Sequence, residues 1–160
     1  MSGKQKITTF LLFDGKAEEA ANHYVSIFGN SKITSVTRYG AAGPEAKGTV
    51  MTVAFRLEGQ EFVALNGGPK VKFTEAISLY VDCESQAEVD ELWRKLSAGG
   101  EESQCGWLKD KFGVSWQIIP AALIRMLQDR DPEKSKRVMQ AMLQMRKIDI
   151  ARLEQAYDKP

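Results

Sequence analysis

The sequence predicts an α+β protein made of two tandem βαβββ modules followed by a C-terminal helical extension. Strand-like and helix-like segments follow one another in the same order twice. A glycine-glycine-proline stretch at positions 67–69 separates the two series, and only helical patterns follow position 120. The 160 residues suit one domain. We predict a single domain over 1–160, with module one at 7–66, a linker at 67–74, module two at 75–119 and a helical tail at 120–160.

The first module begins with a β-rich apolar run at 7–13 that ends at an Asp-Gly pair. Apolar residues at helical spacing then predict a helix from about Ala17 to Phe28, closed by Gly29-Asn30. Three strands are expected next, at 32–39, 49–57 and 61–66, with a tight turn before the last. The order is therefore β, α, β, β, β.

The second module repeats this start. A strand is predicted at 76–81, and Ser85 with Glu88 forms a capping box at the beginning of a helix. Its apolar stripe at i, i+3, i+4 and i+7 consists of Val89, Leu92, Trp93 and Leu96. Two further strands are predicted at 104–108 and 114–119. The halves align by hand, FLLFDGKAEEAANHYVSIFG over SLYVDCESQAEVDELWRKLSAGG, which indicates an internal duplication.

The tail is expected to hold three helices. Pro120 suits the first turn of a helix that runs to about Gln128, and Asp131-Pro132 is an N-cap and N1 pair for the next. That helix carries a stripe of methionines at 139, 142 and 145, for which we favour packing in a core or a subunit interface. Asp149 caps the last helix.

Composition excludes several classes of function. A formal net charge of +1 gives no field that would recruit nucleic acid. No apolar run approaches the roughly 20 residues that span a bilayer, and the polar N-terminus does not resemble a signal peptide. The two cysteines, Cys83 and Cys105, form neither a disulfide framework nor a zinc pattern. We expect a cytoplasmic protein with two free thiols that binds neither nucleic acid nor membranes.

Several segments resemble the PhnB-like branch of the glyoxalase/bleomycin resistance/dioxygenase (vicinal oxygen chelate) superfamily. They are LLFDGKAEEAANHYVSIFGNSKI, FVALNGGP, EAISLYVDCESQAEVD, QCGWLKDKFGVSWQIIP and VMQAMLQMRKIDIARLEQAY. The resemblance runs from about Ile7 to Tyr157 and implies a duplicated βαβββ fold and a homodimer. Members often carry the name 3-demethylubiquinone-9 3-methyltransferase. The sequence argues against methyl transfer, because the glycine-rich strand-to-helix turn of common methyltransferases is absent.

Metal-dependent relatives take histidine and carboxylate ligands from the first and last strands of each module. The corresponding positions in this sequence are Thr8, Ala64, Ala76 and Gln117. Alanine has no donor atom, and threonine and glutamine are weak ligands without charged partners. The single histidine, His23, is expected on the solvated side of the first helix. We therefore predict neither a metal nor another cofactor.

Strand alternation sends every second residue to the same face of a sheet. On this basis we predict an open cleft with Ala64 and Ala76 in its wall and a set of candidate ligand-binding residues, which comprises Thr8, Phe10, Phe62, Asn66, Ser78, Tyr80, Ser115 and Gln117. The aromatic rings suit a flat or apolar ligand, and the amides can donate and accept hydrogen bonds. The alternative is that these side chains only fill the interior.

Cys105 is the one candidate catalytic residue. It lies beside Trp107 and close in sequence to Lys109 and Lys111, whose charges favour a thiolate. The alternative, which we favour, is an inert thiol, because a catalytic thiol needs a base and His23 is distant. Cys83 is expected to be structural.

Three functions remain open. The one we favour is a metal-free protein that binds an unknown small molecule. The second is a metal-dependent lyase, isomerase or dioxygenase of the superfamily, and the third is a scaffold or interaction module based on the tail helices.

Overall fold

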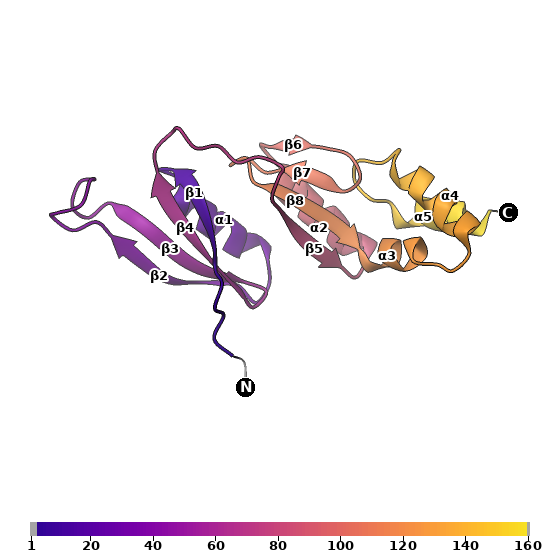
Figure 1. The fold of residues 1–160 in the computed structure, drawn as a ribbon, viewed down its shortest axis with the longest axis horizontal. Coiled ribbons are helices and arrows are strands. Elements are labelled where there is room, and N and C mark those ends of the chain that lie inside the picture. The colour runs from indigo at the N-terminus through magenta and orange to yellow at the C-terminus, as the bar shows by residue number, and fades with distance from the viewer. Residues whose placement is uncertain (1–2, 160) are drawn as a thin grey trace. The chain divides into compact units, whose positions relative to one another are not determined.

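A computed structural model describes residues 3–159, which form two compact units, one up to Lys72 and one from Phe73 onward. Each unit contains one four-stranded sheet (Figure 1). The two units are described separately below.

The first unit has the βαβββ order that the sequence predicts. Its elements are β1 (Thr9–Asp14), α1 (Ala17–Ile27), β2 (Lys32–Arg38), β3 (Val50–Leu57) and β4 (Gln60–Gly67). The sheet order is β1-β4-β3-β2, with β1 parallel to β4 and the other pairs antiparallel. The parallel pair follows from the helical crossover, since α1 carries the chain across one face of the sheet before it returns (Figure 1).

The core of the first unit lies between α1 and that face. The helix buries three alanines and Tyr24, and the small alanine side chains let it approach the strands closely. The Tyr24 ring stacks on Phe55 at 6.2 Å between ring centroids, and Phe55 stacks on Phe62 at 5.5 Å. The opposite face of this sheet carries Phe10, which is 58% exposed.

The second unit repeats the same topology, and its last three strands are shorter than those of the first unit. Its elements are β5 (Ser78–Cys83), α2 (Gln86–Ser97), β6 (Glu101–Glu102), β7 (Trp107–Lys109) and β8 (Ser115–Pro120), in the sheet order β5-β8-β7-β6. The predicted stripe of α2 is buried. The capping box is confirmed in modified form: Ser85 Oγ accepts from the Glu88 amide at 3.1 Å, whereas the Glu88 carboxylate accepts from the amide of Glu84 at 2.8 Å.

The predicted strand at 104–108 is largely wrong. Only Trp107 and Leu108 of that segment belong to a strand, and β6 at 101–102 was not foreseen. Cys105 and Gly106 have positive φ angles of 59° and 84°, so the chain turns there instead of extending. This turn positions the amides of Cys105 and Gly106 to donate to the carbonyls of Met145 and Arg146, each at 2.8 Å.

Three helices follow the second sheet, as predicted: α3 (Ala121–Leu127), α4 (Pro132–Met142) and α5 (Ile150–Asp158). Asp131 caps α4 by accepting from the Glu133 amide, and Asp149 caps α5 by accepting from the Arg152 amide. Gln86 of α2 fixes the last segment, since its amide donates to Ile148 and accepts from the Ile150 amide at 2.7 Å.

The helices share an apolar core with the end of β8. It consists of Ile119, Leu123, Met126, Val138, Met145, Ile148 and Leu153. Two of the three methionines of the predicted stripe contribute to this core, since Met145 is buried and Met142 packs against the cluster. Met139 is 41% exposed and does not belong to it. Within residues 3–159, none of the helices is both long and apolar enough to cross a membrane.

Candidate functional site

A cleft of about 490 Å³ lies in the second unit, over the edge of the sheet formed by β6, β7 and β8. Its volume falls within the usual range for small-molecule sites. The lining residues are Glu75, Glu101, Glu102, Ser103, Gln104, Cys105, Trp107, Leu108, Lys109 and Ser115.

Strand register explains which side chains share the open face of this sheet. Helix α2 buries its apolar stripe against the face that carries Leu108 and Trp116. Side chains of alternate residues point the other way. Cross-strand pairing then sets Lys109 between Glu101 on one side and Ser115 on the other. One row further along, Trp107 pairs with Gln117.

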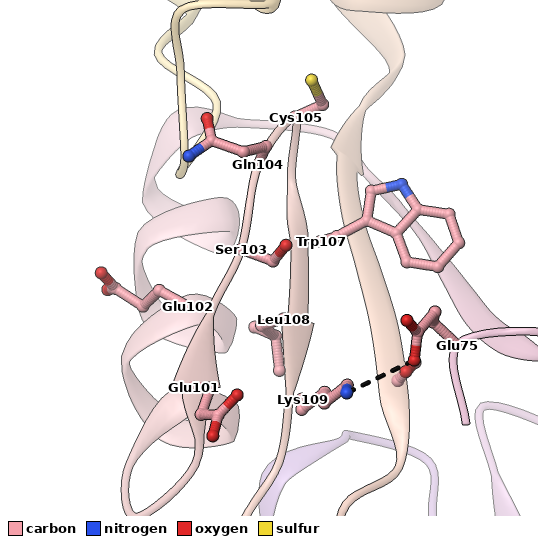
Figure 2. Close-up of a pocket in the computed structure, with 10 residues that line it drawn as sticks. Glu75, Glu101, Glu102, Ser103, Gln104, Cys105, Trp107, Leu108 and Lys109 are labelled. Carbon is pink, nitrogen blue, oxygen red and sulfur yellow. Dashed lines mark ion pairs between the residues drawn. The ribbon is translucent and has the colours of Figure 1, made fainter. Parts of the chain in front are cut away.

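An ion pair closes one end of the cleft. Lys109 Nζ lies 3.3 Å from Glu75 Oε2, and Figure 2 shows this contact across the lower part of the site. The pKa of Glu75 is held below its ordinary value, first by a backbone hydrogen bond and then by Lys109, so Glu75 is ionised at neutral pH. Because this pair is largely exposed, it contributes little to stability.

Ser115 places a polar group in the wall of the cleft. The residue is 2% exposed, and its hydroxyl has no hydrogen-bond partner among residues 3–159. Buried hydroxyls in native proteins are nearly always paired, so an unpaired one in a pocket wall indicates a group that a ligand or water satisfies.

The turn between β7 and β8 fixes the relative position of these two strands, which carry Lys109 and Ser115. Asp110, which is 3% exposed, accepts from the amides of Phe112 and Val114 and from Trp116 Nε1, at 2.9 to 3.0 Å. These bonds hold the hairpin in the register that sets Lys109 opposite Ser115.

The predicted ligand-binding residues belong to both units, with four residues in each. In the second unit, Ser78, Tyr80, Ser115 and Gln117 share the open face, and Gln117 Nε2 donates to Ser78 Oγ at 2.9 Å. Burial raises the pKa of the Tyr80 phenol, which therefore stays neutral. Of these four, Ser115 lines the cleft.

In the first unit, the prediction placed β4 on the wrong face. Phe62 and Ala64 are 5% and 0% exposed and lie with Asn66 on the face covered by α1. The Asn66 side chain accepts a hydrogen bond from the Ala17 amide and donates one to the Val50 carbonyl. This side chain is therefore engaged within the unit. A one-residue error in strand register exchanges the faces of a whole strand.

Of the other two candidates of the first unit, Phe10 is on the opposite face of that sheet, and Thr8 precedes β1. Phe62 pairs with Thr9 and Val63 pairs with Phe10, so Phe10 shares its face with Val63 and not with Phe62. The four residues of the first unit therefore do not form one surface.

The two cysteines differ in their surroundings, since Cys83 is buried and Cys105 is partly exposed. Burial raises the pKa of Cys83 to about 12, so this thiol is neutral, as expected for a structural residue. Cys105 lies at one end of β7 with its sulfur directed away from Lys109, which lies at the other end (Figure 2). Lys111 lies 5.3 Å from the Phe112 ring centroid. His23 is half-buried beside Tyr24 and not fully solvated as predicted.

The positions implied for a metal do not fit one. Ala64 is buried beneath α1, and Gln117 bonds to Ser78. Across residues 3–159, no group of three or more histidine, cysteine, aspartate or glutamate side chains is arranged to hold a metal ion.

Comparison with known proteins places the chain in a family. The family described as 3-demethylubiquinone-9 3-methyltransferase matches residues 5–119. The PhnB protein from Bacillus cereus, which carries 3-demethylubiquinone-9 3-methyltransferase as a proposed name, is 46% identical, with a TM-score of 0.68. That match covers 73% of this chain and 100% of the other. The chain therefore belongs to this family, in the PhnB-like branch of the glyoxalase/bleomycin resistance/dioxygenase superfamily.

More distant structures share the fold. A protein from Pseudomonas aeruginosa is 20% identical, with a TM-score of 0.63 over 73% of this chain and 98% of the other. A variant of the fosfomycin resistance protein FosX from Listeria monocytogenes, complexed with Mn(II) and 1S,2S-dihydroxypropylphosphonic acid, is 15% identical, with a TM-score of 0.50 over 72% and 90%. The comparison with curated proteins found no match. The family match ends at residue 119, although the resemblance was expected to reach Tyr157, so the three tail helices lie beyond it.

Proposed function

We propose that the protein binds a flat, largely apolar organic molecule in the cleft of the second unit, without a resident metal ion. The observation that carries this proposal is a cleft of ligand size with the Trp107 side chain in its wall. Figure 2 shows the Trp107 indole extending from β7.

Trp107 supplies the apolar surface for such a ligand. The other two tryptophans are held within the fold, since Trp93 Nε1 donates to Glu102 at 2.6 Å and Trp116 Nε1 donates to Asp110 at 2.9 Å. Aromatic rings stack in offset or edge-to-face geometry, which suits flat ligands.

Two of the three carboxylates that line the cleft are already engaged, which supports binding without a metal. Glu75 pairs with Lys109, and Glu102 accepts from Trp93. A divalent cation requires several oxygen donors converging on one point, and recruiting these two would break both interactions.

The proposal does not extend to methyl transfer, although the family's description names it. Gly67 ends β4, and the chain then runs to β5 without an intervening helix. The strand-to-helix glycine turn that seats a methyl-donor cofactor in common methyltransferases therefore has no counterpart at this position.

Titration with the neutral fluorophore N-phenyl-1-naphthylamine tests the proposal. We expect saturable binding to EDTA-treated protein that is unchanged by added zinc, manganese or nickel. Trp107→Ala is expected to weaken binding about tenfold, since loss of one aromatic contact costs about 1 kcal/mol or slightly more.

Leu143→Ala is the matched control for this titration. Leu143 is an apolar side chain that is 54% exposed in the tail, so its loss is expected to leave the affinity unchanged. Absence of saturable binding, a requirement for added metal, or an equal effect of the two substitutions would contradict the proposal.

A further inference from the structure

The residues that line the cleft carry an excess of negative charge. The lining includes three carboxylates, those of Glu75, Glu101 and Glu102, and a single ammonium group, that of Lys109, which gives a formal charge of −2. The Glu102 carboxylate bonds to Trp93 of α2, so Glu75 and Glu101 are the two on the side of Lys109. The whole chain has a net charge of +1, so the cleft differs in sign from the molecule as a whole. Local charge of one sign in a concave site selects ligands of the opposite sign.

The single cation of the cleft is not free to bind an anion. Lys109 Nζ is paired with Glu75 at 3.3 Å, and its cross-strand neighbour on the opposite side is Glu101. An anionic ligand would therefore have to displace one carboxylate and lie beside another. Like charges placed close together in a binding site disfavour the complex.

Two further features of the cleft suit a positively charged ligand that carries N–H donors. An indole face attracts cations within about 6 Å of its centroid, and Trp107 provides one. The buried hydroxyl of Ser115, which has no hydrogen-bond partner within residues 3–159, provides an acceptor in the same wall.

From these observations we infer that the cleft selects flat organic cations, with Glu101 and Glu75 providing the charge, Trp107 the stacking surface and Ser115 a hydrogen-bond acceptor. The inference rests on the proposed function and adds the chemical class of the ligand. It also assigns a role to Lys109, which moderates the negative charge of the site.

A matched series of acridines tests this inference. At neutral pH 9-aminoacridine is a cation, acridine is neutral and acridine-9-carboxylate is an anion, while the tricyclic ring is common to all three. We expect affinity to fall in that order, by about two- to fivefold at each step, the range of partly exposed charge pairs. Added sodium chloride is expected to reduce the preference, because exposed charges are screened.

Three variants separate charge from shape. Glu101→Gln is expected to weaken the binding of 9-aminoacridine about two- to fivefold and to leave the affinity for acridine unchanged. Lys109→Met is expected to strengthen the binding of 9-aminoacridine. Glu133→Gln makes the same change in net charge in the first turn of α4, outside the cleft, and is expected to alter neither.

The outcomes distinguish the inference from the proposed function. Equal affinity for the three acridines, or the tightest binding by acridine-9-carboxylate, would overturn the selection of cations while leaving a small-molecule cleft in place. An unchanged affinity for 9-aminoacridine in Glu101→Gln would also overturn it. Failure of every acridine to bind would overturn the proposed function and this inference together.

Discussion

Replacing Asp110 by alanine is expected to lower the free energy of unfolding by about 3 to 5 kcal/mol. One buried carboxylate accepts three hydrogen bonds, two from backbone amides and one from Trp116 Nε1. Alanine would remove this acceptor from all three donors, and the bonds from the Val114 amide and Trp116 Nε1 are buried. The loss of a buried hydrogen bond to a charged group costs about 1.5 to 3 kcal/mol.

Urea denaturation monitored by tryptophan fluorescence measures this effect. Asp110→Asn keeps the size of the side chain and one carbonyl oxygen, so an intermediate loss is expected. Asp82→Ala is the control, because Asp82 is an exposed aspartate at the end of β5 and its loss should change stability by less than about 0.5 kcal/mol. Equal stabilities of Asp110→Ala and Asp82→Ala would show that the hairpin does not depend on Asp110.

Gly106→Ala is expected to destabilise the protein by about 2 to 4 kcal/mol and to loosen the tail helices. Gly106 has a φ of 84°, which side-chain-bearing residues rarely adopt. A β-carbon there would lie 2.7 Å from Ile119 Cδ1 and 3.0 Å from the Ile118 carbonyl oxygen, so the backbone would have to move. That movement would also disturb the bond from the Gly106 amide to Arg146.

Hydrogen exchange distinguishes this local effect from general destabilisation. Amides of the segment that leads into α5 are expected to lose protection first, because its anchor to the sheet is weakened. Gly68→Ala is the matched control, since a β-carbon at Gly68 would meet nothing within 4 Å. Unchanged stability in Gly106→Ala would contradict the role assigned to this turn.

The sequence predicted most of the elements because their signals are local. The caps Ser85, Asp131 and Asp149 each precede a helix at the expected residue. The apolar stripe of α2 is strong enough to identify its buried face without other information. In both cases, residues within one or two turns determine the structure.

The errors arose where structure depends on distant contacts. Strand β6 consists of two glutamates, which have no preference for strands and extend because they pair with β7. Cys105 and Gly106 leave the strand conformation to bond with Met145 and Arg146, some 40 positions away in sequence.

The prediction of which face of β4 lines the cleft was wrong for a related reason. Phe55 and Phe62 stack under α1, a contact that joins β3 to β4 and sets which residues of β4 point inward. Alternation alone gives two equally good choices of face. The cleft residues Glu75, Glu101 and Lys109 were missed as a group. Glu101 and Lys109 meet through strand pairing, Glu75 reaches Lys109 from the segment before β5, and nothing in their sequence spacing signals either contact.

The most direct test of the proposed site is a titration of EDTA-treated protein with N-phenyl-1-naphthylamine, followed by ¹H–¹⁵N NMR at the three tryptophan indoles. We predict that the Trp107 signal shifts most, together with the backbone amides of residues 103–109 and Ser115. Trp116, which is held by Asp110 on the other face of the sheet, is predicted to shift least. A larger shift at Trp116 than at Trp107, or shifts confined to the tail helices or the first unit, would contradict a small-molecule site in this cleft.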